Sequence, residues 1–204
     1  MMRILFLTAI LALPIAHGDE RRTVVFFGDS LTAGLGVDIN EAFPALIQEK
    51  INNAELPWRV VNAGLSGETT AGGLRRIDWV LKQRVDCLVL ELGANDGLRG
   101  LPPTLTRSNL QAIIDRTRAT YPNALVLVVG MLMPPNFGEE LTREFAQIFP
   151  AIAESNRAPL IPFLLVGVGG IPELNQSDGI HPTARGHVVM AETVWAYLQP
   201  MLRQ

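Results

Sequence analysis

Short apolar runs alternate with longer segments of helical periodicity along most of this chain. Continuous apolar runs separated by helices are typical of parallel strands that are buried on both faces. The pattern therefore predicts one α/β domain, a three-layer α/β/α sandwich around a five-stranded parallel sheet with right-handed crossovers. The runs expected to be strands are 23–27, 58–63, 86–92, 124–130 and 158–165. The segments expected to be helices are about 41–53, 69–84, 104–120, 139–155 and 183–199.

The first 18 residues differ in character from the rest of the chain. A basic residue, Arg3, precedes an apolar run over 4–16, and the small-residue segment "AHG" follows it. This order is typical of a secretory signal peptide, so we expect cleavage after Gly18 and a single domain over 19–204. The alternative is an uncleaved membrane anchor, although the run is short for a transmembrane span. We expect the mature protein to be exported, to the periplasm or beyond, and to have no stable membrane span.

Composition narrows the possible partners and cofactors. Of the 204 residues, 48% are hydrophobic, and 17 basic residues against 20 acidic ones give a formal net charge of −3. No basic patch stands out, so nucleic acid is not an expected partner. The single cysteine, Cys87, lies in an apolar run and is expected to be buried, and it cannot form an internal disulfide. No cluster of histidine, cysteine and carboxylate residues is of metal-ligand type, so no metal or cofactor is expected.

Glycines and small polar residues follow most of the predicted strands. In a parallel sheet the loops after the strands gather at one edge, and ligands bind there. The four loops concerned are "GDSLTAGLGV" (28–37), "NAGLSGETTAGG" (62–73), "GANDGLRG" (93–100) and, after the fifth strand, "DGIHPTARGH" (178–187). Functional residues are therefore sought in these four loops together.

Ser30, in the first of these loops, is the candidate nucleophile. The usual Gly-x-Ser-x-Gly elbow is absent, because the local sequence is "GDSLT". The chain is therefore not expected to be an α/β-hydrolase of the usual form. The alternative interpretation of Ser30 is a helix N-cap, a common role for serine before a helical segment.

Gly67 and Asn95 are candidate donors to an oxyanion. A glycine N–H in a tight loop and an asparagine side-chain amide can both point at one oxygen, and the Ser30 N–H would add a third donor. Each residue also has a simpler interpretation. Gly67 would then be needed only for a turn with positive φ, and the Asn95 side chain would only form an Asx-turn.

Asp178 and His181 are the candidate acid and base. A serine hydroxyl needs a base within hydrogen-bonding reach, and that base gains from a carboxylate that fixes its tautomer. The alternative is a capping aspartate with a surface histidine. His187 competes for the base role, but it lies within the last helical segment, where we expect it to cover the surface or to pair with an acid. His181 is favoured because its proline-flanked loop is expected to hold it beside the sheet edge.

Taken in order, the four loops resemble the conserved blocks of the SGNH hydrolases, also called GDSL-type esterases. The similarity covers about residues 23–199 and is greatest to the bacterial periplasmic arylesterases and the multifunctional acyl-CoA thioesterase I/lysophospholipase L1 group. It implies a flavodoxin-like fold, catalytic residues Ser30, Asp178 and His181, and an oxyanion hole formed by Ser30, Gly67 and Asn95. Glu68 departs from the pattern, since many relatives have aspartate there, and the difference is expected to affect loop hydrogen bonds.

The resemblance implies a serine esterase or thioesterase that works through an acyl-serine intermediate, without metal or cofactor. Aryl esters, acyl-CoA thioesters and lysophospholipids are the implied small-molecule substrates. Two alternatives remain open at this point. One is a carbohydrate O-acetylesterase that uses the same residues, and the other is a non-catalytic envelope binding protein that retains the loops.

Overall fold

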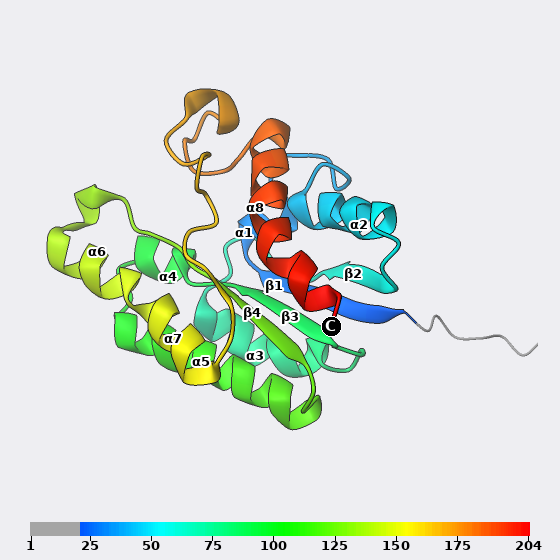
Figure 1. Cartoon of the computed structure of the whole chain (residues 1–204). Helices are drawn as coiled ribbons and strands as arrows, with labels where there is room; N and C mark the ends of the chain where they lie inside the picture. The colour runs from blue at the N-terminus through cyan, green and yellow to red at the C-terminus, as the bar shows by residue number, and fades with distance from the viewer. Residues whose placement is uncertain (1–20) are drawn as a thin grey trace, which may run out of the picture.

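A single parallel sheet forms the centre of the computed structural model, which describes residues 21–204 (Figure 1). Its strands lie in the order β2-β1-β3-β4-β5, and each neighbouring pair is parallel. The sheet predicted from the apolar runs is therefore confirmed. The predicted signal segment, 1–18, lies outside the described residues. The strands are β1 (Arg22–Gly28), β2 (Trp58–Asn62), β3 (Cys87–Glu91), β4 (Leu125–Val129) and β5 (Leu160–Ile161).

Helices cover both faces of the sheet and complete the three-layer sandwich (Figure 1). On one face α2 packs against α8, and on the other α5 packs against both α3 and α7. The helices are α1 (Ser30–Ala33), α2 (Phe43–Asn53), α3 (Thr70–Val80), α4 (Ala94–Leu98), α5 (Pro103–Thr120), α6 (Glu139–Ala146), α7 (Ile148–Asn156) and α8 (Ala184–Leu202). Two 3-10 turns, η1 (Pro135–Phe137) and η2 (Pro172–Leu174), lie in the loops after β4 and β5.

Side chains along β1 point alternately to the two faces of the sheet and so contact the helices on both sides. Phe26 and Phe27 are both fully buried, and successive strand residues point to opposite faces. Phe26 packs edge-on against Phe43 of α2, with 5.5 Å between ring centroids. Phe27 points to α3, where a side chain at Gly73 would meet Leu92 and the Phe27 ring. The missing side chain of Gly73 therefore lets α3 lie close to the sheet.

Prolines account for two of the places where the elements differ from the prediction. The helix expected over 139–155 is divided between α6 and α7 at Gln147. Pro150 lacks an N–H, and its ring would clash with the carbonyl of Ala146 in a continuous helix. The strand expected over 158–165 is only β5, two residues long, because Pro159 and Pro162 flank it and cannot donate to the ladder.

The carboxyl ends of the strands lead into short loops and helix starts. α1 begins two residues after β1, and α4 begins three residues after β3, so both helices start at the same sheet edge. Neither short helix was expected from periodicity. Within residues 21–204, no helix combines the length and the apolar character needed to cross a bilayer. The edge defined by these helix starts is where the candidate residues gather.

Candidate active site

Ser30 is the first residue of α1, directly beyond the end of the buried strand β1. Asp29 is the N-cap of this helix, and its Oδ1 accepts the Leu31 N–H at 3.0 Å. The capping role considered for Ser30 thus belongs to Asp29, and the serine hydroxyl is left for another partner. Ser30 is 8% exposed, and the helix ends after one turn at Gly34, whose φ of 78° suits glycine. The backbone therefore presents Ser30 at a fixed position on the sheet edge.

Asp178 and His181 form a self-contained hydrogen-bonded turn before α8. Oδ1 of Asp178 accepts the N–H groups of Ile180 and His181, at 2.9 and 3.0 Å. Its Oδ2 lies 2.7 Å from Nδ1 of the His181 ring. The backbone and side-chain hydrogen bonds from His181 lower the pKa of Asp178, so this side chain is a carboxylate at neutral pH.

The turn is attached to the rest of the molecule by Gln176. Its Nε2 donates to the carbonyl of Leu35, just after α1, at 2.7 Å and to the carbonyl of Pro182 at 2.9 Å. The Gln176 N–H also donates to the His181 carbonyl at 2.7 Å. The loop that carries the acid and the base is thereby tied to the segment that follows the serine.

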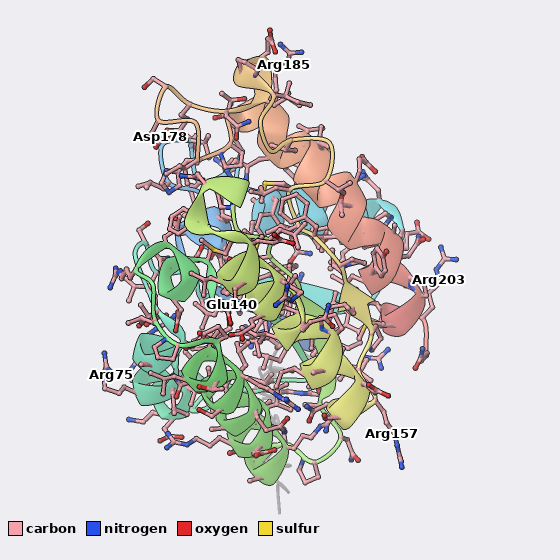
Figure 2. The ribbon with its side chains drawn as sticks, turned by 90° about the vertical axis from the view of Figure 1, so that its left-hand side faces the viewer. Arg75, Glu140, Arg157, Asp178, Arg185 and Arg203 are labelled. Carbon is pink, nitrogen blue, oxygen red and sulfur yellow. The ribbon has the colours of Figure 1, made fainter. Side chains whose placement is uncertain are left out.

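Ser30 and His181 meet at hydrogen-bonding distance, although 151 positions separate them in the sequence. Nε2 of His181 lies 2.9 Å from Oγ of Ser30. Since Nδ1 carries the proton that is shared with the carboxylate, Nε2 is the acceptor and the serine O–H donates. Asp178, labelled in Figure 2, projects from the loop at the end of the molecule where α8 begins. A serine, an imidazole and an aspartate connected in this order by hydrogen bonds allow a proton to move from the hydroxyl to the ring.

Gly67 lies in the loop between β2 and α3, beside the end of β1. Leu65 N–H donates to the Gly28 carbonyl at 3.0 Å, and the Gly67 carbonyl accepts from Arg99 at the end of α4, at 2.8 Å. Its φ of 78° requires glycine, as the turn interpretation held. Within the described chain, neither the Gly67 N–H nor the Ser30 N–H has a protein acceptor. Both donors are therefore available to an added oxygen.

Asn95 lies in the first turn of α4 and points toward the serine turn. Its Nδ2 donates to Oδ2 of Asp29 at 3.1 Å, so one amide hydrogen is fixed by the residue that precedes Ser30. The other amide hydrogen can serve a second acceptor. The structure therefore brings Ser30, Asp178 and His181 together through direct contacts. It joins Asn95 to the serine turn through Asp29, and Gly67 to α4 through Arg99.

His187 is not a surface residue and has no acid partner within the described chain, so the expectation for it was wrong. It is 1% exposed within α8, where its ring stacks on Phe43 at 6.2 Å and its Nδ1 accepts the Phe43 N–H at 3.2 Å. Burial lowers the pKa of His187 to about 4, so the ring is neutral. An imidazole consumed by this contact is not available as a base for Ser30.

Arg76 holds the loop that contains Gly67 and was not identified from the sequence. Its guanidinium pairs with the carboxylate of Glu68, donates to the Ala63 carbonyl at 2.9 Å, and lies 4.4 Å from the centroid of the Phe27 ring. The Glu68 residue noted as unusual is thus the partner that joins one end of the loop to α3. The signal in the sequence is weak, because Arg75 and Arg76 are adjacent and only the helix register distinguishes them.

Two further buried carboxyl groups lie behind the serine and Gly67 loops. Asp96 is fully buried and accepts the Thr70 N–H at 2.8 Å, which joins the start of α3 to α4. Glu91 is fully buried at the end of β3. Over residues 21–204, no set of three or more histidine, cysteine or carboxylate side chains is arranged to hold a metal ion.

A parallel α/β sandwich with this serine, histidine and aspartate at its strand ends has the arrangement of a serine hydrolase. Residues 26–189 match the GDSL-like lipase/acylhydrolase family. Esterase TesA of Pseudomonas aeruginosa is 39% identical over 203 residues, which cover 98% of this chain and all of the relative. An arylesterase of Vibrio mimicus is 35% identical, covering 95% and 96%. The thioesterase 1/protease 1/lysophospholipase L1 of Escherichia coli is 37% identical, covering 88% and 85%.

Solved structures agree with the sequence relatives. The crystal structure of TesA superposes with a TM-score of 0.84 at 39% identity, covering 88% of this chain and 99% of that one. The psychrotrophic esterase EstA from Pseudoalteromonas sp., inhibited by monoethylphosphonate, gives 0.83 at 31% identity, covering 90% and 100%. The chain belongs to the GDSL-like lipase/acylhydrolase family. It is accordingly an ester-hydrolysing enzyme, and the expectations of fold and family are confirmed.

Proposed function

We propose that Ser30 is the nucleophile of this esterase, that His181 is its general base and that Asp178 orients the base. The observation that carries this assignment is the continuous chain of contacts from Asp178 Oδ2 through the His181 ring to Ser30 Oγ, at 2.7 and 2.9 Å. Geometry of this kind lets the imidazole accept the serine proton as the carbonyl is attacked. The carboxylate then stabilises the imidazolium that forms.

The reaction runs in two steps with one acyl-serine intermediate. Ser30 Oγ attacks the carbonyl carbon while Nε2 of His181 takes its proton, and the same proton is then given to the departing alcohol, phenol or thiol. Water enters next, loses a proton to His181 and attacks the acyl-serine. The carboxylic acid leaves, and the proton returns to Ser30. No other co-reactant is needed for this balance.

The negative oxygen of each tetrahedral intermediate rests against the N–H groups of Ser30 and Gly67 and the side-chain amide of Asn95. Support comes from the two N–H groups that lack a protein acceptor in the described chain and from the Asn95 amide that Asp29 fixes at 3.1 Å. Preorganised donors need no rearrangement as the charge develops. Loss of one such donor is expected to lower kcat about 10²–10³-fold.

Acyl esters and thioesters with an apolar chain or ring are the proposed substrates. Large apolar side chains are exposed on the loops and short helices that follow the strands, at the sheet edge that carries Ser30, where they can contact an acyl chain or an aromatic leaving group. These residues are Leu35, Leu65, Leu98, Leu132 and Ile180. The relatives named for aryl ester, thioester and lysophospholipid hydrolysis point to the same classes.

Export to the periplasm or beyond is part of the same proposal. It depends on the basic, apolar and small-residue order of residues 1–18, which lie outside the described residues. Expression from the full sequence in a bacterial host should give a periplasmic protein whose N-terminal residue is Asp19. An N-terminus at Met1 in a membrane fraction would point to the uncleaved anchor.

A Ser30→Ala variant tests the assignment, with Ser66→Ala as the matched control because Ser66 is an exposed serine of the neighbouring loop. Turnover would be measured on p-nitrophenyl esters of increasing chain length, on an acyl-CoA and on a lysophospholipid. We expect Ser30→Ala to lower kcat by at least about 10⁴-fold on every substrate, with Ser66→Ala close to wild type. Equal turnover in the two variants would exclude Ser30 as the nucleophile. A preference for acetyl over longer chains would contradict the proposed substrate class.

A further inference from the structure

A carboxyl group lies at the centre of the sheet where an apolar side chain would be expected. Glu91 is the last residue of β3, every residue of that strand is buried, and Glu91 itself is fully buried. In the parallel register it lies opposite Gly28, the last residue of β1. A buried carboxyl group is costly unless its oxygens are hydrogen-bonded or it is neutral. The contacts of Glu91 therefore indicate what the group does there.

One oxygen of Glu91 accepts hydrogen bonds from residues before and after Ser30 in the sequence. Oε2 accepts the Thr32 O–H at 2.7 Å and the Asp29 N–H at 3.2 Å. Asp29 directly precedes Ser30, and Thr32 follows it by two residues. A side chain at Gly28 would overlap both the Thr32 hydroxyl and the Glu91 carboxyl. The glycine that ends β1 thus leaves space for this carboxyl group beneath the serine turn.

The other oxygen of Glu91, Oε1, is buried and has no partner among donors in the described chain. Asp29, also fully buried, already accepts the Leu31 N–H and the Asn95 amide with its own two oxygens. The Asp29 and Glu91 carboxyl groups lie close together, because the Asp29 N–H donates to Oε2 of Glu91 and the charge of Asp29 acts on Glu91. Two carboxylates this close in a buried place cannot both be charged, so one of the pair carries a proton.

The proton belongs to Glu91 rather than to Asp29. Asp29 accepts two N–H donors that favour its charged form. Burial raises the pKa of Asp29 to about 6, which leaves it ionised at neutral pH. Burial, together with the charge of Asp29, raises the pKa of Glu91 well above its usual range. If Oε1 of Glu91 carries the proton, this oxygen, which otherwise has no partner in the described chain, can donate a hydrogen bond to the Asp29 carboxylate.

We infer that Glu91 is a positioning residue, held as a neutral acid, that donates from Oε1 to the Asp29 carboxylate and fixes the Ser30 turn and the Asn95 amide as one unit. The chain of contacts runs from Glu91 to Asp29 and on to Asn95, with the serine between them in sequence. Glu91 does not touch the substrate in this account. The inference deepens the proposed function, since it depends on Ser30 and Asn95 having the roles given above.

The first test measures the proton itself. Infrared difference spectra of wild type against Glu91→Gln at pH 8, where Asp29 is ionised, should contain the carbonyl band of a protonated carboxyl group that the variant lacks. Glu173→Gln, which removes an exposed carboxylate from η2, is the matched control and should leave that band in place. Absence of any such band from wild type would overturn the neutral state of Glu91.

The second test asks whether Glu91 acts through hydrogen bonds as a neutral acid, through a negative charge, or only by filling space. Glutamine keeps an acceptor for Thr32 and Asp29 and a donor for the Asp29 carboxylate, whereas methionine keeps only the shape. We expect Glu91→Gln to retain kcat within about threefold, and Glu91→Met to lower kcat about 10–100-fold with little change in KM. Loss of kcat in the glutamine variant equal to that in the methionine variant would overturn the inference, as would wild-type kcat in the methionine variant.

The outcomes remain distinct from those of the proposed function. Should Glu91→Met fail to fold, the infrared comparison and the glutamine variant still decide the question. Should Ser30→Ala keep full turnover, the catalytic assignment fails while the infrared band of Glu91 is unaffected. A wild-type band, a near-normal glutamine variant and an inactive Ser30→Ala variant together support both statements.

Discussion

The serine and its base come from two regions of the molecule that are built in opposite ways. Ser30 follows a strand that is buried from Thr23 to Gly28, and Asp29 before it and Glu91 beneath it are fully buried. Asp178 and His181 lie on an exposed loop, where the side chain of Asp178 is 45% exposed and that of His181 19%. The serine region is fixed by burial and by the sheet, and the acid–base region by hydrogen bonds made in the presence of water.

This difference indicates where precision depends on packing and where it depends on polar contacts. Buried strand ends open only with the whole fold, whereas exposed loops can open locally at a lower free energy. The loop with Asp178 is held mainly by the Gln176 bonds and by its own Asx-type turn. Substitutions in the two regions should therefore fail in different ways: by loss of the proton relay in the loop, and by misplacement of donors in the sheet region.

Among substitutions that keep Ser30 and His181 in place, the largest effect is expected in the exposed region, from Asp178→Asn. The asparagine can keep the shape of the turn but cannot hold Nδ1–H of His181 as a carboxylate does, so the tautomer with Nε2 as acceptor is lost. We expect kcat on a p-nitrophenyl ester to fall about 10³–10⁴-fold, with the same unfolding midpoint within error. Glu173→Gln, on the same loop and also exposed, serves as the control. A fall of less than tenfold would show that the carboxylate does not orient the base.

An intermediate effect is expected from Arg76→Met, in helix α3 beside the Gly67 loop. The change removes the ion pair with Glu68 and the bond to the Ala63 carbonyl, and so it frees the loop that presents the Gly67 N–H. We expect kcat to fall about 10–100-fold with a small change in KM, because the donor is needed chiefly in the transition state.

Arg75→Met is the matched control for this variant. Arg75 is exposed on the outer side of α3 (Figure 2), whereas the Arg76 guanidinium lies over the Phe27 ring of the sheet. Arg76→Lys should recover little activity, because lysine cannot make the bidentate contact. Equal kinetics for the Arg75 and Arg76 variants would remove the argument that this loop is positioned from α3.

The smallest effect on catalysis, and a distinct effect on stability, is expected from His187→Asn. The unfolded chain binds a proton on this histidine near pH 6.5 and the folded protein only near pH 4. The unfolded state therefore binds more protons between these values, and stability falls as the pH falls. The contribution is at most about 3 kcal/mol by pH 4.

Denaturant unfolding of the His187→Asn variant at pH 7 and at pH 4.5 tests the prediction that His187 makes the protein less stable at the lower pH. The introduced asparagine keeps an acceptor for the Phe43 N–H but does not titrate, so the difference in stability between the two pH values should be smaller than in wild type. Val188→Asn, at the exposed neighbouring position, should keep the wild-type difference. An unchanged difference in the His187 variant would mean that this ring does not couple folding to pH.

The sheet and the gathering of the candidate loops could be predicted because both follow from short-range patterns. Apolar runs define buried strands, and parallel strands bring their following loops to one edge, which places Ser30 near His181 without knowledge of any contact. Proline-broken elements, as at Pro150 and Pro162, were predicted too long because hydrophobicity alone continues across a proline. At these positions the missing N–H of proline interrupts the element although the hydrophobic pattern continues.

The supporting residues could not be predicted because their roles depend on contacts between distant strands and helices. Glu91 belongs to an apolar run and meets Asp29 only through the strand register. Arg76 differs from Arg75 only in the face of the helix it occupies. His187 was misjudged because helix position alone does not show that Phe43 of another helix covers it. These are long-range packing facts, and single-sequence patterns carry little information about them.

The most direct test of the central claim, that the Ser30 hydroxyl is activated by His181, is covalent labelling with an alkyl phosphonate probe followed by peptide mapping. One phosphonyl group per chain is predicted, on the peptide that contains Ser30. Labelling should be slowed by orders of magnitude in His181→Asn but not in His187→Asn. A label on another residue, no label on wild-type protein, or equal labelling rates in the two histidine variants would contradict the account.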